Sequence, residues 1–268
     1  MSPSIAVAAT APFGADVLER LAATHEVVSV LTRPDARAGR GRTLAPSAAK
    51  LAAERLGLTV LEPERLEPGL DLGAPVVVAV AYGLIVPDPV LDERLWLNVH
   101  PSLLPRWRGA APVERALMAG DSETGVSIIR LVKELDAGPI AAQHSFAVEP
   151  DDDAGEVFER SAELAADLLD RVLAEPDPTF REQEGEPTHA AKITPADRHL
   201  DLDRPARKLV DHVRALSPHI GARADLHGRG VTIWKARVGE DGRFEPVEVQ
   251  PDGGRRMTYD AWLRGLRP

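Results

Sequence analysis

Short apolar segments alternate with amphipathic segments along the first two thirds of the chain, and this alternation limits the fold more than any other feature. The segment 75–81 is an unbroken apolar run of the kind that is buried on both faces of a parallel sheet. It is too short to span a bilayer. Strands and helices that alternate at this spacing predict an α/β fold with a mostly parallel sheet and helices on both faces. The expected strands are 3–9, 27–31, 75–81, 95–99, 125–131 and 140–148, and the expected helices are 14–23, 46–56, 112–120 and a long one around 157–172.

The last quarter of the chain has a different pattern, with one amphipathic helix followed by short strands. The segment 175–187 before it is acidic, contains proline and is typical of connecting chain. We therefore predict an α/β domain over 1–187, a linker over 188–204 and a β-rich domain over 205–268. In the last domain we expect a helix at 205–216, strands at 222–226, 231–238 and 244–249, and a terminal helical turn at 259–266.

Composition narrows the possible classes of protein. The sequence has no cysteine, which excludes disulfides, thiolate metal sites and a cysteine nucleophile. The net charge of −10 argues against indiscriminate nucleic-acid binding, yet residues 190–268 hold 15 Lys and Arg against 11 Asp and Glu. A basic tail that meets a polyanion and a chance distribution over a solvated surface explain this asymmetry equally well. The N-terminus has no signal-peptide pattern, so a cytoplasmic location without membrane attachment is expected.

An amide and an imidazole stand two residues apart where the predicted strand 95–99 ends. Residues i and i+2 of a strand face the same side, so Asn98 and His100 should point together. In open α/β sheets ligands bind beyond the carboxyl ends of the strands. There the amide can donate a hydrogen bond to a developing oxyanion, and the imidazole can carry a proton near neutral pH. The pair alone also fits an Asn and a His that merely end a strand.

A longer run of sequence resolves this choice. The strand continues into Ser-Leu-Leu-Pro, then Arg-Gly-Ala-Ala-Pro, and later Leu-Asp-Ala-Gly-Pro. The run 97–140 resembles the 10-formyltetrahydrofolate-dependent formyltransferases almost residue for residue. This resemblance implies a Rossmann-like fold, 10-formyltetrahydrofolate as the formyl donor, no metal, and a catalytic trio of Asn98, His100 and Asp136. In formyl transfer, Asn98 would stabilise the oxyanion, His100 would carry the proton, and Asp136 would favour the imidazolium. Taken by itself, Asp136 is better explained as a residue of a β-turn.

The resemblance also implies where the folate lies. In proteins of this kind, the backbone of the loop after strand 75–81 holds the pterin ring, and Gly83 would let the main chain approach a flat ring. A simple turn and a core position for Tyr82 fit the same residues. Arg106 and Arg108 would bind a substrate phosphate or the glutamate tail of folate, or lie on the surface. The residues implied for the folate site are Ala81, Tyr82, Gly83, Leu84, Ile85, Ser102, Leu103, Leu104 and Pro105.

The segment 33–47 carries four arginines against one aspartate. Such a loop can wrap phosphates and stack on unpaired bases, or it can simply be solvated. Its Pro-Asp, Gly-Arg-Gly and Leu-x-Pro-Ser pattern is similar to an insertion of the formyltransferases that act on methionyl-tRNA. That similarity implies that Arg37, Arg40 and Arg42 meet the acceptor end of an initiator methionyl-tRNA.

The resemblance weakens towards the C-terminus. The segments 191–193 and 231–236 match, but much of the five-stranded barrel of the relatives is missing. We therefore predict a shortened, OB-like β-barrel domain, and the contacts of the family with the body of the tRNA come into doubt. The first hypothesis is a monomeric enzyme that formylates methionyl initiator tRNA. The alternatives are a formyltransferase for a small amine such as an amino sugar nucleotide, and a folate- or RNA-binding protein without catalysis.

Overall fold

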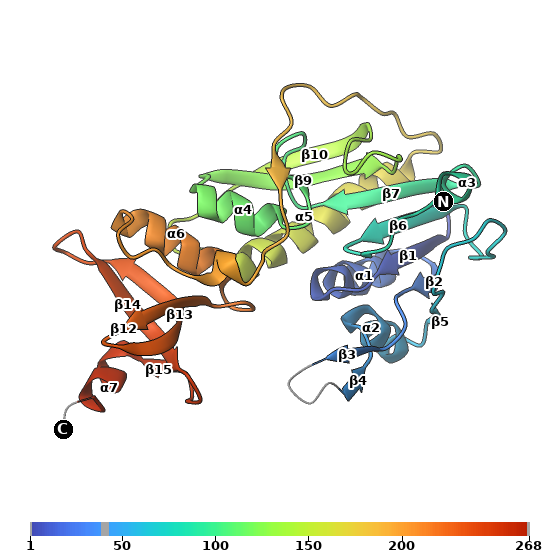
Figure 1. Cartoon of the computed structure of the whole chain (residues 1–268). Coiled ribbons are helices and arrows are strands. Elements are labelled where there is room, and N and C mark those ends of the chain that lie inside the picture. Colours follow the sequence, from blue (N-terminus) through green and yellow to red (C-terminus); the bar gives the residue numbers. More distant parts are fainter. Residues whose placement is uncertain (1, 39–42, 267–268) are drawn as a thin grey trace. The chain divides into compact units, whose positions relative to one another are not determined.

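The computed structural model describes residues 2–38 and 43–266. Its main sheet has seven strands in the order β10-β9-β7-β6-β1-β2-β5 (Figure 1). The neighbours from β7 to β5 pair in parallel, whereas β9 joins β7 antiparallel, which confirms the predicted mostly parallel sheet. The strands are β1 (Ile5–Ala9), β2 (Val27–Leu31), β5 (Thr59–Leu61), β6 (Val76–Val80), β7 (Leu95–His100), β9 (Glu123–Arg130) and β10 (Ile140–Ala147).

The strands β1 and β6 are buried along their whole length, which shows that both faces of this sheet are covered. Helix α1 (Pro12–Thr24) packs on one face, where it contacts α2 (Ala48–Arg55) and, through His25 and Asp170, α5 (Ala154–Ala174). The other face is covered by the short helix α3 (Asp88–Leu91) and by the irregular segment that carries Leu66 and Leu72. The Tyr82 side chain packs in this second cluster, and its burial raises the pKa of the hydroxyl to about 12.

Local sequence explains how two of these helices begin. Helix α1 has proline in its first turn, and Gly14 lies so close to the sheet that a Cβ there would be 2.6 Å from the Val80 carbonyl oxygen. Only glycine allows this approach. Helix α2 begins after Ser47, whose hydroxyl accepts a hydrogen bond from the Lys50 backbone nitrogen at 3.0 Å, as the predicted helix start requires.

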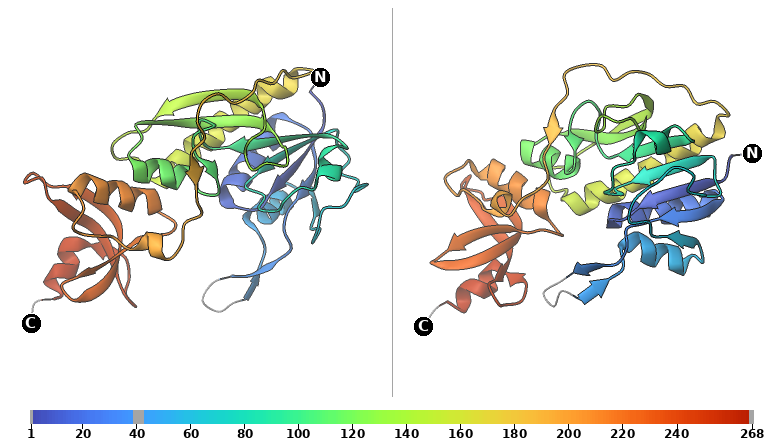
Figure 2. Two further views of the ribbon diagram at one scale, coloured as in Figure 1. Left: turned by 45° about the horizontal axis from the view of Figure 1, so that its top comes forward. Right: turned by 45° about the vertical axis from the view of Figure 1, so that its right-hand side comes forward.

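The segment before α2 forms a hairpin that the sequence analysis treats as a loop. Strands β3 (Ala36–Ala38) and β4 (Thr43–Ala45) pair antiparallel, with Arg37 opposite Leu44. Figure 2 shows from two sides that these strands extend away from the main sheet. At the base of the hairpin, the Thr32 hydroxyl oxygen lies 2.6 Å from that of Ser47. Lys50 binds Asp35 at 2.8 Å and also Glu62, and these hydrogen bonds hold the pKa of Lys50 above its ordinary value.

The chain divides into two compact units, which are described separately. The first comprises Met1–Arg108, Gly125–Ser145 and Glu159–Thr188, and the second Gly109–Thr124, Phe146–Phe158 and His189–Pro268. The first unit thus ends one residue beyond the predicted boundary at 187, while the second takes in two segments from the middle of the chain. The predicted domain limits, with a linker at 188–204, stay a prediction.

The second unit contains the predicted C-terminal β-rich region. Its antiparallel sheet has the order β12-β13-β14-β15, so β12 and β15 are its edges. This order is an open sheet rather than a closed barrel in the part of the chain that the structure describes. The elements are α4 (Pro112–Ala119), α6 (Ala206–Leu216), β12 (Ala222–Leu226), β13 (Arg229–Val238), β14 (Phe244–Pro251), β15 (Met257–Thr258) and α7 (Tyr259–Arg264), with short β8 (Arg108–Gly109), β11 (His189–Ala190) and a 3-10 turn (Ala196–Arg198).

A buried ion pair on α6 contributes to the stability of this unit. Asp211 is 2% exposed and accepts a hydrogen bond from Arg214 Nε at 3.0 Å. Arg214 Nη1 also donates to the carbonyl oxygens of Glu149 and Asp152. The guanidinium is thus held among buried acceptors, of which the Asp211 carboxylate carries the compensating charge.

We expect Asp211→Ala to lower the free energy of unfolding by about 3–5 kcal/mol, because the substitution leaves a buried cation without its anion. Urea denaturation measures this loss. Asp252→Ala is the matched control, since it breaks the exposed pair with Arg223 and should cost less than about 1 kcal/mol. Equal losses for the two variants would contradict a special role for the buried pair.

No helix within 2–38 or 43–266 has the length and apolar character that crossing a membrane requires.

Candidate active site

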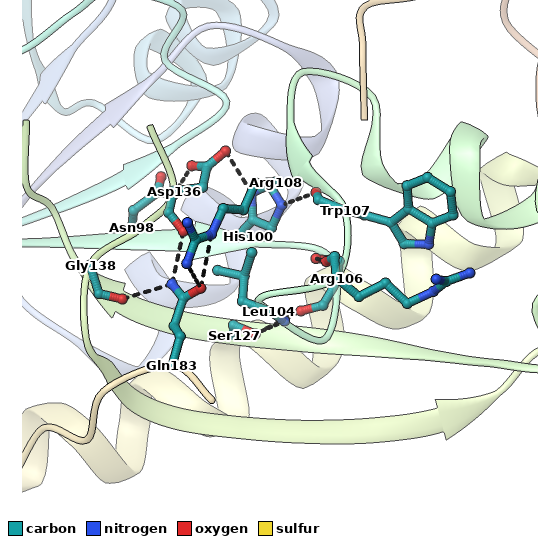
Figure 3. Close-up of polar contacts among 11 residues, drawn as sticks. Asn98, His100, Leu104, Arg106, Trp107, Arg108, Ser127, Asp136, Gly138 and Gln183 are labelled. Carbon is teal, nitrogen blue, oxygen red and sulfur yellow. Dashed lines mark hydrogen bonds and ion pairs between the residues drawn. The ribbon is translucent and has the colours of Figure 1, made fainter. Parts of the chain in front are cut away.

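The three residues of the predicted trio meet at the carboxyl end of β7. Asn98 and His100 lie on this strand, where Asn98 pairs with Ala79 of β6 and Ile129 of β9. Asp136 comes from the loop between β9 and β10. Its Oδ1 lies 3.5 Å from Asn98 Nδ2, and its Oδ2 lies 3.7 Å from His100 Nδ1 (Figure 3). The structure therefore brings together an amide, an imidazole and a carboxylate.

The hydrogen bonds of His100 fix the position of its proton. Its Nε2 lies 2.9 Å from the Trp107 carbonyl oxygen, and because a carbonyl only accepts, Nε2 carries the hydrogen. Nδ1 then faces the Asp136 carboxylate, with both residues buried. A neutral ring would present a lone pair to this carboxylate, whereas an imidazolium presents an N–H. A hydrogen on Nδ1 would therefore face the carboxylate.

Backbone strain is concentrated around the trio. Among the described residues other than glycine, positive φ occurs at Ala81 (47°), Trp107 (65°) and Asp136 (51°), and otherwise at His227. Such conformations cost energy and persist where surrounding contacts impose them. At Trp107, the backbone nitrogen donates to Thr188 Oγ1 at 2.9 Å, and the carbonyl meets His100. Strain therefore occurs at the groups that orient the imidazole and the carboxylate.

The segment 102–105, which the resemblance assigns to the folate site, supports the loop from inside. The Ser102 hydroxyl donates to the Arg106 carbonyl oxygen at 2.7 Å. Ser127 Oγ donates to the Ser102 carbonyl oxygen and accepts from the Leu104 backbone nitrogen. The side chains of Ser102 and Leu104 are buried, while Leu103 and Pro105 are half-buried. A direct role of these residues in folate binding stays a prediction.

The loop after β6 has the conformation that close approach to a ligand needs. Both Ala81 and Gly83 have positive φ, and the Thr10 hydroxyl donates to the Tyr82 carbonyl oxygen at 2.8 Å. Ile85 is 92% exposed. The Tyr82 side chain lies in the core, so at this position only the main chain is open to a ligand. The role of this loop in folate binding also stays a prediction.

A cavity of about 680 Å³ lies beside α3, at the start of β7 and the end of β9. The sequence analysis missed it, because its walls come from three segments that carry no common motif. The residues predicted for the folate site do not line it. Its lining residues are Asp88, Leu91, Asp92, Arg94, Leu95, Trp96, Arg130, Leu131, Val132 and Lys133.

Of the arginines predicted to bind tRNA, Arg37 lies exposed on β3, next to the anchored base of the hairpin. Arg40 and Arg42 lie outside the described residues.

The segment 175–187 has no helix or named strand, as expected for connecting chain, but it is bonded to the edge of the main sheet. Arg181 exchanges two backbone hydrogen bonds with Ile140 of β10, at 2.7 and 3.0 Å, and Arg130 stacks on the Phe180 ring. Gln183 then contacts the main chain of the Asp136 loop. Sequence reasoning missed Gln183, because a single glutamine in an acidic stretch gives no local signal.

Comparison with known proteins agrees with this fold. The family of formyl transferases matches residues 4–173, and the formyl transferase C-terminal domain matches residues 192–246. A curated methionyl-tRNA formyltransferase of Paracoccus denitrificans is 40% identical over 289 residues, covering 96% of this chain and 95% of the relative.

Two solved structures have the same fold. Methionyl-tRNA formyltransferase from Clostridium thermocellum superposes with a TM-score of 0.65 at 16% identity, covering 92% of this chain and 98% of that one. HypX from Aquifex aeolicus in complex with tetrahydrofolic acid gives a TM-score of 0.66 at 16% identity and covers 98% of this chain. The chain spans about half the length of HypX, 47%. With both domains matched and a close full-length relative, the chain belongs to the formyl transferase family.

Proposed function

We propose that the protein transfers the formyl group of 10-formyltetrahydrofolate to the amino group of methionyl initiator tRNA, giving N-formylmethionyl-tRNA. One observation carries this proposal. An amide donor, a buried imidazole and a carboxylate meet within 3.5–3.7 Å in a chain that is 40% identical to a methionyl-tRNA formyltransferase.

The geometry supports a role for each member of the trio. The amine attacks the formyl carbon, a C–N bond forms, and the carbonyl electron pair moves onto oxygen. Asn98 Nδ2 has two hydrogens, so one can meet the Asp136 carboxylate while the other donates to this oxyanion. When the tetrahedral carbon collapses, the bond to N10 of the folate breaks and N10 takes the electron pair.

Proton transfer accompanies these steps, since the new ammonium loses a proton and N10 gains one. His100 Nδ1 is the atom placed to take up that proton, because Nε2 is already bound to the Trp107 carbonyl oxygen. The Asp136 carboxylate at 3.7 Å stabilises the resulting imidazolium. His100 returns the proton to N10, so the net reaction consumes none.

The loop 81–85 fits the folate donor, because it follows β6 at the same end of the sheet as Asn98 and His100. Gly83 has a positive φ, and no atom beyond its chain neighbours lies within 4 Å of where its Cβ would stand, so its main chain is open to a flat ring. Residues 102–105 would support the loop that carries Arg106 and Trp107.

The hairpin β3–β4 fits an anchor for the acceptor end of tRNA. If Arg37 meets a phosphate there, Arg37→Ala should raise the KM for methionyl-tRNA roughly 10-fold and leave kcat unchanged, since a charge-assisted hydrogen bond is lost in ground and transition states alike. Steady-state kinetics at several tRNA concentrations measure this change, and the difference should shrink at high salt.

Arg65→Ala is the control, because Arg65 is exposed but belongs to neither the hairpin nor the trio. The tRNA assignment of Arg37 is wrong if both variants keep the KM of the unmodified protein.

A second candidate acceptor is an amino sugar nucleotide, which stays open because the C-terminal sheet of the described chain has only the four strands β12-β13-β14-β15. Formyl transfer to charged initiator tRNA and to an amino sugar nucleotide, run in parallel, separates the two functions. Rapid formylation of the tRNA alone supports the proposal, and formylation of the sugar alone overturns it.

We place the enzyme in the cytoplasm as a monomer, and light scattering during size-exclusion chromatography tests the oligomeric state.

A further inference from the structure

Gln183 joins the Asp136 loop to Arg108 through both ends of its side-chain amide. Its Nε2 lies 2.8 Å from the carbonyl oxygen of Asp136 and 2.8 Å from that of Gly138. Its Oε1 lies 3.0 Å from Arg108 Nε and 2.6 Å from Arg108 Nη2 (Figure 3). Because carbonyls only accept and a guanidinium only donates, the amide has one orientation that satisfies all four contacts.

The strained turn at Asp136 depends on contacts to its main chain as well as on those of the Asp136 carboxylate. Asp136 has a φ of 51°, and Gly138 lies so close to β9 that a Cβ there would be 1.8 Å from the Arg130 carbonyl oxygen. The carboxylate lies 3.5 Å from Asn98 Nδ2 and 3.7 Å from His100 Nδ1. Contacts at these distances are weak, whereas the two 2.8 Å bonds from Gln183 hold the main chain of the turn.

Arg108 completes the arrangement from the opposite side of the amide. Two of its N–H groups point to Gln183, and its backbone nitrogen donates to the Thr188 carbonyl oxygen at 2.9 Å. The guanidinium is therefore engaged inside the protein, which favours a structural task over the substrate-phosphate and folate-tail roles left open by the sequence.

We propose that Gln183 is a positioning residue for formyl transfer: it holds the main chain of Asp136 so that the carboxylate faces Nδ1 of His100, and Arg108 fixes the amide in that orientation. The inference rests on the proposed function, because the effect of Gln183 is expressed only through the Asp136–His100 pair.

Gln183→Glu tests this role with almost no change in shape. The new carboxylate keeps the bonds to Arg108 but turns an oxygen towards two carbonyl oxygens, so the turn loses both hydrogen bonds that Gln183 donates. We expect kcat to fall about 10- to 100-fold, with the KM for folate and for the formyl acceptor changed less than about 3-fold. Gln183→Met removes the same bonds without adding charge and should lower kcat in the same way.

A double-mutant cycle separates positioning from general support of the fold. In an Asp136→Asn background, Gln183→Glu should lower the residual kcat less than about 2-fold, since a residue that acts through Asp136 has nothing left to position. Gln250→Glu is the matched control, because this glutamine also spans two partners, Trp234 and Gly254, in the second unit. The kcat of Gln250→Glu should equal that of the unmodified protein.

Unchanged kcat in Gln183→Glu and Gln183→Met would overturn the inference. So would an equal loss in the Asp136→Asn background, which would show that Gln183 acts independently of the carboxylate. The thermal unfolding midpoint of each variant shows that the proteins compared are folded. If the unmodified protein transfers formyl to neither tRNA nor an amino sugar nucleotide, the proposed function fails instead, and the inference falls with it.

Discussion

His100→Ala is expected to slow formyl transfer roughly 10²- to 10⁴-fold at saturating substrates, the range for a positioned acid–base group. The imidazole is held from two sides, by the Trp107 carbonyl oxygen at 2.9 Å and by the Asp136 carboxylate at 3.7 Å. Alanine removes the group that would carry the proton from the new ammonium to N10. Rapid-quench kinetics with enzyme in excess measure the chemical step without product release.

His144→Ala is the matched control, because this histidine is exposed on β10. It should retain the full rate. The expected loss in His100→Ala should appear in kcat, while the KM for both substrates changes little, since the imidazole acts in the transition state. A His100→Ala variant with the unmodified rate would remove His100 from the mechanism.

The second large effect is expected for Asn98→Ala, which should lower kcat roughly 10²- to 10³-fold, the loss seen when one oxyanion donor is removed. Asn98 is the only asparagine in the chain, and its strand register next to Ala79 and Ile129 fixes the direction of its side chain. Alanine leaves the strand intact but provides no donor at the oxyanion.

Asn98→Asp sharpens this test. The carboxylate keeps the shape of the amide, yet it stands near Asp136 Oδ1, which is 3.5 Å from the amide nitrogen, and it repels the oxyanion. We therefore expect it to be at least as slow as Asn98→Ala. Activity near the unmodified level in Asn98→Asp would show that the oxyanion is stabilised elsewhere.

Much of the first unit follows from the sequence, because period-2 and period-3.6 patterns report burial directly. The fully apolar run around β6 is a central strand, and the alternation along β7 places Asn98 and His100 on one side of it, as predicted. The Ser47 cap of α2 is equally local. These features depend on residues that lie close together in the sequence.

The remaining parts of the site depend on contacts between distant segments. Asp136 could be assigned only by resemblance, because its place beside His100 depends on how β9 and its following loop lie against β7. Gln183 meets that loop across 47 residues of chain. The Trp107 carbonyl is a main-chain group, so no side-chain pattern marks it.

The most direct test of the account is a single-turnover measurement of formyl transfer from 10-formyltetrahydrofolate to charged initiator methionyl-tRNA, with the unmodified protein and His100→Ala side by side. We expect rapid formylation by the unmodified protein and a rate roughly 10²- to 10⁴-fold lower for the variant. Equal rates for the two proteins, or no formylation of the tRNA by the unmodified one, would contradict it.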